Sequence, residues 1–535
     1  MAQKVKQPGV ADPKAVRLVK LHDQKKGERS NWESHYREAL KYTIPSMDNV
    51  YFSRTDGAKE NTHLYDGTGG EAVVELAAAM QSLTSNPAAK WFEFTTGNPK
   101  LDLETEVIKY LQDVGDIIHD ILAGSNFYSE NLSNLMDVGI LGTTSLFAGE
   151  DDVDIVRFKA TPIYEVYPRY DIMGRVYDLS REVEMDYGQL ERRFGADKLK
   201  ELDANKDAQV SENRKYKVIH YIEATKNKGT PGAFDSNWVL RSPSVVLEEK
   251  IFHEMPYACP RFMVMPGESL GRSPSMMALP DLKTLNSMAK TVLQGAQLAI
   301  LPPVNVTDRG LLRPLKMVPS GVNYTRKGSE IKPITLGANP QIGVDLLSYY
   351  EGKVRKKYFL DKLQIASNDR MTATEIVQRR DENFRGVSPI FVRWDDEYTK
   401  PTISRVFAIA GRKGKLPKAP AALANNRDLG IKYTSVMAQA QLAGQAENLN
   451  RVFANTAPIL EAKPEAWDLF NADTIIKGNI KRFSVEGDFL NSDAKVKEIR
   501  KARAEAQAAA AEQQEQLANA ETVNKITPAM KGGEV

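Results

Sequence analysis

The chain has 535 residues, 42% of them hydrophobic and 27% charged, which excludes a largely disordered protein and predicts two to four packed modules. With 72 basic and 70 acidic residues its net charge is only +2, so no dedicated nucleic-acid-binding domain is indicated. The single cysteine, Cys259, excludes an intrachain disulfide framework and fits a reducing cytoplasm. Neither a membrane-spanning segment nor a signal peptide is recognisable, so we expect a protein made and used in solution.

The first 30 residues carry eight Lys or Arg against three Asp or Glu, which predicts a mobile basic N-terminal arm. Helical spacing of apolar residues begins at Asn31 and stops at Ile44-Pro45. Three more helices are predicted, from Asp66-Gly67 to Asn86-Pro87, over 104–122 and over 129–140. The N-terminal part of the chain is therefore expected to be mostly helical.

After Gly149 the apolar period changes to two, and turn residues recur to about Met265, which predicts β-hairpins with one short helix near 187–194. A helix is then predicted over 274–301 and a second over 343–362. The segment between them, which starts at Pro302-Pro303, reads as a small β insertion.

A Thr cap at Thr372 with Glu375 three residues later predicts the start of a very long helix that runs to Ile409. Pro389 and Pro401 are expected to kink it, because proline removes a backbone donor and clashes with the preceding turn. A basic, Pro-rich linker follows, and helices are predicted over 437–460 and 492–523. The last helix is rich in Ala and has almost no large apolar face, so it needs a partner.

The motifs that suggest catalysis fail on their context. Gly267 to Gly271 matches the G-x-S-x-G nucleophile elbow, but all six histidines precede Ser269, against the chain order of such hydrolases. Gly67 to Gly70 reads as the start of a helix and not as a phosphate loop, and the acidic cluster from Glu150 to Asp154 reads as an exposed turn before a strand. We therefore expect no catalytic residue, no metal site and no cofactor.

Four stretches, in order along the chain, carry a resemblance to a known family. They are Leu64 to Gly69 with Pro87 to Phe92, Gly267 to Pro274 with Ala278 to Asn286, Arg370 to Ile376, and Tyr433 to Ala440. They are similar to signatures of the portal proteins, or head-to-tail connectors, of short-tailed double-stranded DNA bacteriophages. The resemblance covers residues 31 to 505, and the order helix, β insertion, helix, polar loop, long helix also resembles the portal core.

The resemblance implies a mainly α fold with β insertions (α+β), the portal fold, assembled as a dodecameric ring around a central DNA channel. Its modules would be the wing (31–271), a stem helix (272–301), the clip (302–335), a second stem helix (342–363), the tunnel loop (364–371), a long kinked wing helix (372–411), and the crown with a C-terminal helical barrel (412–535). By the same implication, Ala502 to Val523 would pack against its neighbours in the ring.

The implied function is that of a non-enzymatic ring at a unique capsid vertex, a late protein that conducts double-stranded DNA during genome packaging and ejection. The implied partners are further copies of the chain, non-specifically bound DNA, the terminase large subunit, the major capsid and scaffolding proteins, and tail adaptors. The implied location is the virion, with assembly in the host cytoplasm. The alternatives are a phage DNA-processing enzyme such as a nuclease, and a tail or scaffold protein without a DNA channel.

Two groups of residues are candidates for contact with DNA. In the tunnel loop, Asn368, Asp369 and Arg370 are expected to project into the channel, although the loop could be an ordinary helix linker. Basic residues also gather in the stem and clip, where they could face DNA, an acidic partner, solvent or carboxylates of a neighbouring subunit. They are Arg309, Arg313, Lys316, Arg326, Lys327, Lys353, Arg355, Lys356 and Lys357.

Overall fold

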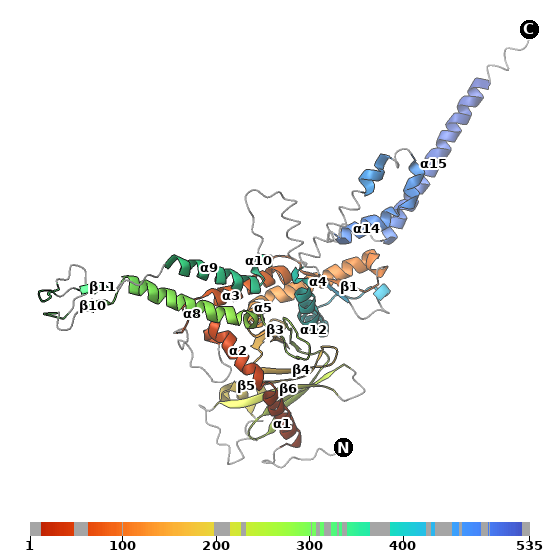
Figure 1. The fold of residues 1–535 in the computed structure, drawn as a ribbon. Coiled ribbons are helices and arrows are strands. Elements are labelled where there is room, and N and C mark those ends of the chain that lie inside the picture. Colours follow the sequence, from red (N-terminus) through yellow and green to blue (C-terminus); the bar gives the residue numbers. More distant parts are fainter. Residues whose placement is uncertain are drawn as a thin grey trace, which may run out of the picture. The chain divides into compact units, whose positions relative to one another are not determined.

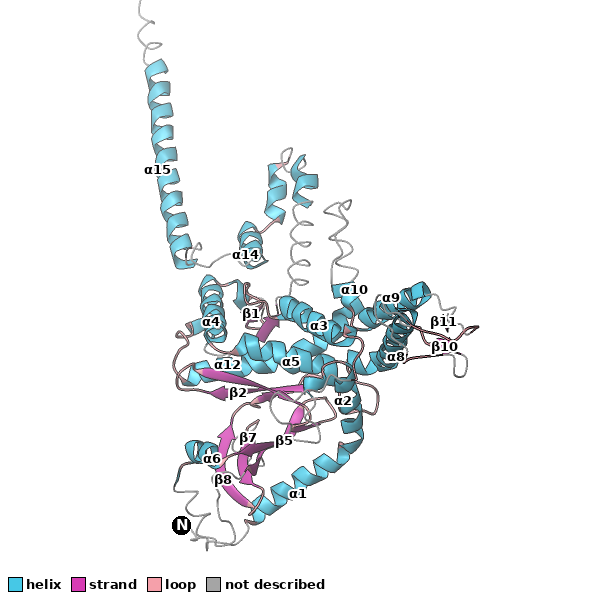
Figure 2. Ribbon diagram, turned by 90° about the vertical axis from the view of Figure 1, so that its left-hand side faces the viewer, coloured by secondary structure: helices cyan, strands magenta, loops and turns pink. Residues whose placement is uncertain are grey.

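The computed structural model divides the chain into two units, Met1–Ala89 with Ile121–Ile409, and Lys90–Asp120 with Ala410–Val535. The described residues are 12–47, 63–98, 100–196, 215–225, 232–300, 302–306, 311–314, 323–328, 331–333, 340–363, 386–423, 430–433, 452–458, 463–482, 491 and 493–526. Within them the fold is mostly helical with β insertions, as predicted (Figures 1 and 2). No helix in these ranges is both long and apolar enough to cross a bilayer.

The prediction of a mobile N-terminal arm is wrong for residues 13 to 28. They form helix α1 (Pro13–Glu28), which starts at an Asp12 cap and lies on a β-sheet (Figure 2). Ala15 and Leu18 pack against the sheet residues Ile219, Tyr221 and Val239. Four of the basic side chains that suggested a solvated arm, those of Lys14, Arg17, Lys25 and Lys26, are in fact paired with carboxylates of this sheet. Residues 1 to 11 lie outside the described part of the chain.

Three further helices of the first unit lie close to their predicted positions, namely α2 (Ser30–Tyr42), α3 (Thr68–Thr84) and α5 (Phe127–Leu141). A short 3-10 turn, η1 (Pro45–Met47), follows α2. The glycines at the start of α3 permit close packing, because a Cβ at Gly69 would lie 2.6 Å from the Tyr42 carbonyl oxygen. The interpretation of Gly67 to Gly70 as a helix start is therefore confirmed.

The predicted β-hairpins form two antiparallel sheets. A three-stranded sheet has the order β3 (Val156–Pro162), β2 (Thr144–Glu150), β9 (Tyr257–Ala258). The five-stranded sheet follows chain order, with β4 (Val166–Tyr170), β5 (Val176–Met185), β6 (Tyr216–Ala224), β7 (Phe234–Leu240) and β8 (Val245–Phe252). The short helix α6 (Tyr187–Phe194) has its predicted bounds and begins with a reciprocal cap between Asp186 and Gln189.

Helices α8 (Pro274–Ile300) and α9 (Pro340–Lys357) lie side by side and form an arm (Figures 1 and 2). At the far end of the arm, β10 (Val304–Val306) pairs antiparallel with β11 (Ile331–Pro333). The predicted second helix was too long, because it ends at Lys357 and a separate turn, α10 (Leu360–Leu363), follows. Phe359 lies between them with φ +59°, a left-handed conformation that breaks the helix.

The long helix is described only from residue 386 onward, so its predicted cap at Thr372 lies outside the described residues. The chain is helical over 386–394, continues as a π-helical turn, η3 (Asp395–Thr399), and then as α12 (Lys400–Arg412). At this turn the Lys400 N–H donates to the Asp395 carbonyl, five residues back. The wider turn directly precedes Pro401, which has no N–H to donate.

In the second unit, β1 (Phe92–Thr95) pairs antiparallel with β12 (Gly430–Tyr433). Its helical elements are η2 (Leu101–Leu103), most of α4 (Thr105–Gly124), η4 (Ala421–Leu423), η5 (Pro464–Leu469), α14 (Ala472–Arg482) and α15 (Asp493–Ile526). The Ala-rich helix was predicted correctly as α15, and Arg500 on it forms an ion pair with Asp473 of α14 at 2.6 Å. Of the helix predicted over 437–460, the structure describes 452–458, which are helical.

Candidate functional site

The arm formed by α8 and α9 is fixed at its base by ion pairs within the chain. Lys353 and Lys357 of α9 both contact Asp281 of α8, at 3.1 and 2.5 Å. Arg355 contacts Glu75 of α3 at 2.9 Å. Burial alone would raise the pKa of Asp281, but hydrogen bonds from the two lysines hold it below the ordinary value. Three of the predicted basic residues thus orient α9 against α8 and α3.

The other predicted basic residues have different surroundings. Arg313 is exposed and its guanidinium lies 5.4 Å from the ring centre of Tyr324. Arg326 and Lys327 are exposed in the turn region before β11, and Lys356 is exposed on α9. Arg309 and Lys316 lie outside the described residues, as do Asn368, Asp369 and Arg370 of the predicted tunnel loop. Their contact with DNA stays a prediction.

Along the arm the two helices approach closely. A Cβ on Gly343 would lie 2.7 Å from a methyl carbon of Val292, so this pair marks the seam between α9 and α8. Beyond the base, large apolar side chains are exposed on both helices, which is unusual for a surface that stays in water. They are Leu293, Leu298 and Ile300 of α8 and Ile342, Val344, Leu346 and Tyr349 of α9.

Helical geometry sorts these apolar residues into two opposite flanks. Each residue turns the helix by about 100°, so Ile342, Leu346 and Tyr349 lie on one side of α9. Val344 lies about 200° from Ile342, on the other side of the Gly343 seam. The two helices run antiparallel, so Leu293 and Ile300 of α8 lie on the same flank as Val344. Leu298 lies on the flank of Ile342. The spacing of four and then three residues from Ile342 is a signal of this flank in the sequence, but by itself it predicts only a helix.

The G-x-S-x-G stretch has a structural role. A Cβ on Gly271 would lie 2.4 Å from the Gly142 carbonyl oxygen, and Gly142 itself has φ +77°. The Ser269 carbonyl accepts a hydrogen bond from Arg261, whose side chain also forms an ion pair with Glu397. Glycine is needed here for close backbone contact, which explains the motif without a nucleophile.

The acidic cluster is also explained locally. The Asp151 carboxylate accepts hydrogen bonds from the backbone N–H groups of Val153 and Asp154, which fixes the turn before β3. In the described part of the chain no group of three or more His, Cys, Asp or Glu side chains could hold a metal ion. Cys259 is buried, and burial raises the pKa of its thiol to about 12.

Comparison with known proteins identifies the family. The sequence model described as "Bacteriophage head to tail connecting protein" matches residues 15–490. The chain belongs to that family. It is 27% identical over 528 residues to a "Probable portal protein" of Bordetella phage BPP-1, with 95% of this chain and 94% of the relative covered. It is 28% identical over 527 residues to the "Portal protein" of Salmonella phage epsilon15, with 94% and 93% covered.

Among solved structures, the connector is similar to a chain of the neck of an empty gene transfer agent particle, at 11% identity and a TM-score of 0.35. That match covers 81% of this chain and 98% of the other. Family membership confirms the prediction of a phage portal, or head-to-tail connector, protein. It is a structural, non-enzymatic component of the virion at the head-tail junction.

Proposed function

We propose that the connector assembles as a closed ring in which the arm of each subunit packs flank to flank between the arms of its two neighbours. The observation that carries this proposal is the exposure of apolar side chains on both flanks of the arm. Ile342 and Tyr349 on one flank are 58% and 61% exposed, and Leu293 and Ile300 on the other are 50% and 77% exposed. Contact with neighbouring copies would remove this apolar surface from water.

Opposite flanks favour a ring over a simple dimer. A two-fold dimer uses the same surface patch on both subunits and would leave the second flank exposed. A head-to-tail contact uses one flank from each subunit and continues from copy to copy until the rotation closes. Twelve copies are the number that the family resemblance implies, and the enclosed channel would conduct double-stranded DNA.

Within this proposal α8 and α9 are the stem and the β10–β11 hairpin is the clip. The residues 364–371 would be the tunnel loop, with Asn368, Asp369 and Arg370 in the channel. The exposed clip residues Arg313, Arg326 and Lys327 would contact DNA or an acidic partner, which suits docking by the terminase and later by tail adaptors. Residues 412–535 would form the crown with its C-terminal helical barrel, and capsid and scaffolding proteins would surround the ring.

The test uses one charge on each flank. Leu346→Glu and Leu293→Glu should each prevent ring closure, because a carboxylate would be buried at every contact. Ser348→Glu, which adds the same charge to an exposed position of α9 between the flanks, is the matched control. Electron microscopy counts subunits and shows whether a central pore is present.

Mixing the two flank variants makes the test decisive. In a head-to-tail contact, each variant keeps one intact flank, so the mixture should form pairs of one L346E and one L293E subunit and no rings. Rings formed by either single variant would contradict the proposal. A wild-type assembly without a central pore would also contradict it, and is the result expected of a tail or scaffold protein without a channel.

A further inference from the structure

Outside the arm, three large apolar side chains of the first unit are more exposed than any others among its described residues. Val153 is 87%, Ile172 101% and Met173 79% exposed, and no other in those residues exceeds 60%. Val153 lies in the turn 151–155 between β2 and β3, the Val153 turn, and the other two lie in the turn 171–174 between β4 and β5. Single exposed apolar side chains are common, so their surroundings decide whether they indicate a contact.

Both turns are stabilised by hydrogen bonds of their own. The Asp171 carboxylate accepts hydrogen bonds from the N–H groups of Met173 and Arg175, and the Asp171 N–H donates to the Arg175 carbonyl. In the Val153 turn, the Asp151 N–H donates to the carbonyl of Ile155, which has φ +66°. A β-branched residue rarely adopts this left-handed conformation. Because the apolar tips are already ordered, little conformational entropy is lost when a partner covers them.

A second loop lies against the turn 171–174. Arg261 donates to the Gly174 carbonyl at 3.3 Å and to the Ser269 carbonyl at 3.1 Å, which holds the loop 263–269 beside this turn. The ion pair of Arg261 with Glu397 fixes the guanidinium in place. The loop adds partly buried apolar side chains next to the exposed tip, those of Met263, Val264 and Met265. We call the turn and this loop together the paired loops.

The Val153 turn and the paired loops lie at opposite ends of strand β2. Thr143, just before β2, is bridged to Arg261, whereas Glu150 at its end pairs with Val156, which directly follows the Val153 turn. The 7 residues of β2 separate the two ends by about 20 Å, at ~3.3 Å per residue. One subunit therefore cannot join its own two sites, but a head-to-tail contact joins the sites of different copies.

The charges of the two sites permit this contact. Around the Val153 turn carboxylates outnumber guanidiniums, with Glu150, Asp151, Asp152, Asp154 and Glu254 against Arg157 and Arg405. In the paired loops Glu268 is paired with Arg272, and Arg261 with Glu397. The Asp171 carboxylate is bound by N–H groups of its own turn. Arg175 is exposed and forms no ion pair within the described part of the chain, so it is available to a carboxylate of another copy.

The size of the apolar tips indicates what covers them. Three side chains cannot hold a partner alone, since a stable interface buries about 800 Å² on each side. The contact fits a partner that another surface already brings close, which in the proposed ring is the neighbouring copy. We propose that the Val153 turn of each subunit packs against the paired loops of the next, with Val153 on Ile172 and Met173. This inference rests on the proposed function, because the arms must first align the copies.

Disulfide trapping tests the contact. Val153→Cys and Met173→Cys in one chain should crosslink neighbouring copies under mild oxidation and give a ladder of covalent oligomers on a non-reducing gel. Within one subunit the two positions are too far apart for a disulfide, which needs Cα atoms within about 7 Å. Native Cys259 is buried and does not compete. Val153→Cys with Ile251→Cys is the matched control, since Ile251 is 55% exposed on β8.

We expect V153C/M173C to form covalent oligomers at least ten times as efficiently as V153C/I251C, and a mixture of the single variants V153C and M173C to stop at dimers. Rings in electron micrographs without this crosslink, or equal crosslinking in the control, would overturn the contact and leave the ring intact. Covalent dimers of V153C alone, which a two-fold contact would give, would also overturn it. Absence of rings in the wild-type protein would instead overturn the proposed function, so the two failures are distinguishable.

Charge reversal supplies a second readout that leaves the apolar tips unchanged. Arg175→Glu should raise the protein concentration at which half of the chains are in rings at least about threefold at low salt, because a carboxylate would then face those of the Val153 turn. The difference should vanish at about 1 M salt, where the screening length is about 3 Å. Arg192→Glu, the same reversal at an exposed position of α6, should leave the midpoint unchanged. An unchanged midpoint in R175E at low salt would contradict the contact.

Discussion

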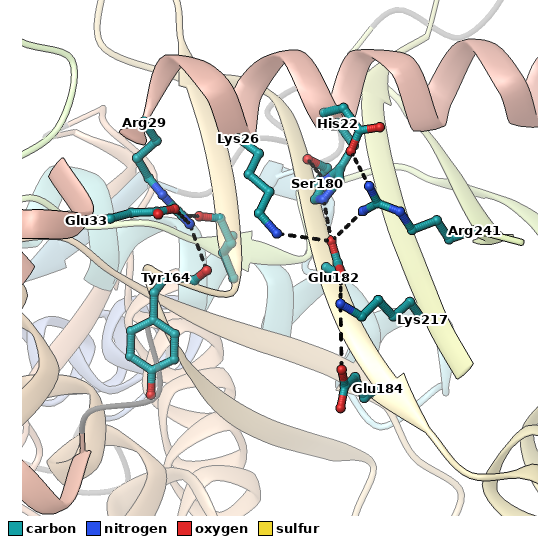
Figure 3. A network of polar contacts seen from close by, with 12 residues as sticks. His22, Lys26, Arg29, Glu33, Tyr164, Ser180, Glu182, Glu184, Lys217 and Arg241 are labelled. Atoms are coloured by element: carbon teal, nitrogen blue, oxygen red, sulfur yellow. Dashed lines mark hydrogen bonds and ion pairs between the residues drawn. The ribbon is translucent and has the colours of Figure 1, made fainter. Parts of the chain in front are cut away.

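Replacement of Glu182 by glutamine should weaken the attachment of helix α1 to the sheet. Glu182 lies on β5, and its carboxylate contacts side chains from three other elements (Figure 3). His22 Nε2 and Arg241 Nη1 each lie 2.9 Å from it, Lys217 Nζ lies at 3.5 Å and Lys26 Nζ at 3.9 Å. One carboxylate thus joins α1 to β6 and to the end of β7.

The magnitude follows from the pKa of this carboxyl. Burial would raise it, but the hydrogen bond from His22 and the charges of Lys26 and Arg241 outweigh burial and lower the pKa from 4.5 to about 2. A shift of this size corresponds to about 3 kcal/mol, at about 1.4 kcal/mol per unit. Lys26 and Lys217 are about half exposed, so solvent screening reduces the value to about 2 kcal/mol.

Hydrogen exchange of the α1 amides measures this loss directly, because it reports local opening without requiring the whole chain to unfold in one step. A loss of about 2 kcal/mol should speed exchange in α1 about 30-fold in Glu182→Gln. Glu184→Gln is the matched control, since Glu184 is 39% exposed and contacts only Lys217, at 3.8 Å, among the ion pairs of the described residues. Unchanged protection in E182Q, or an equal loss in E184Q, would refute the reasoning.

The pH dependence has a definite sign. Because the folded-state pKa of Glu182 is below its ordinary value, the stabilisation is present above about pH 4.5 and is lost as the pH falls toward about 2. Exchange in α1 of the wild type should therefore approach that of E182Q as the pH falls through this window. A constant difference between the two proteins down to pH 2 would contradict the linkage.

Further predictions concern other parts of the chain. Native Cys259 should react with a small thiol reagent at pH 8 at least about 100-fold more slowly than the denatured chain, because burial raises its pKa to about 12. Arg405→Met should destabilise the first unit by about 3 kcal/mol, measured by hydrogen exchange in α12. The substitution removes a buried guanidinium that lies 2.7 Å from the Glu254 carboxylate. Deletion of 368–370 should spare ring assembly but impair packaging or retention, and normal genome content in such particles would contradict a tunnel loop. Truncation at Asp493 should weaken the ring, as judged by its dissociation temperature, if α15 packs against neighbouring copies.

The helices that the sequence predicts well are those whose apolar spacing and end signals agree. Helix α6 was predicted with its bounds, and in the structure Asp186 and Gln189 cap its start and Gly195 follows its end. The start of α8 was equally clear, at Pro274 directly after Ser273. In these segments local preference and tertiary packing favour the same conformation.

The remaining differences between the predicted and the observed elements arise where the conformation depends on more than the local sequence. The charged side chains of α1 fit a solvated arm until their partners are known, and Lys25 and Arg17 pair with carboxylates on β5 and β6 that are more than 150 residues away. No local signal in the sequence indicates the break after α9, since phenylalanine seldom adopts the left-handed conformation that Phe359 has here. The π-helical turn before Pro401 is similar, because the sequence predicts a disturbance there but not whether the helix bends, stops or widens.

The basic cluster of α9 shows why charge alone is a weak guide to a DNA-binding surface. Lys353, Arg355 and Lys357 are as basic as any residues in the arm, yet their ion pairs with Asp281 and Glu75 hold α9 in place. Because these charges are neutralised within the subunit, they add little to affinity for a passing polyanion. The DNA channel that we propose would benefit from this arrangement, since tight phosphate contacts would retard the DNA that must leave it. Charge alone does not distinguish residues that fix the arm from residues that could bind DNA, and only the ion pairs in the structure identify the first group.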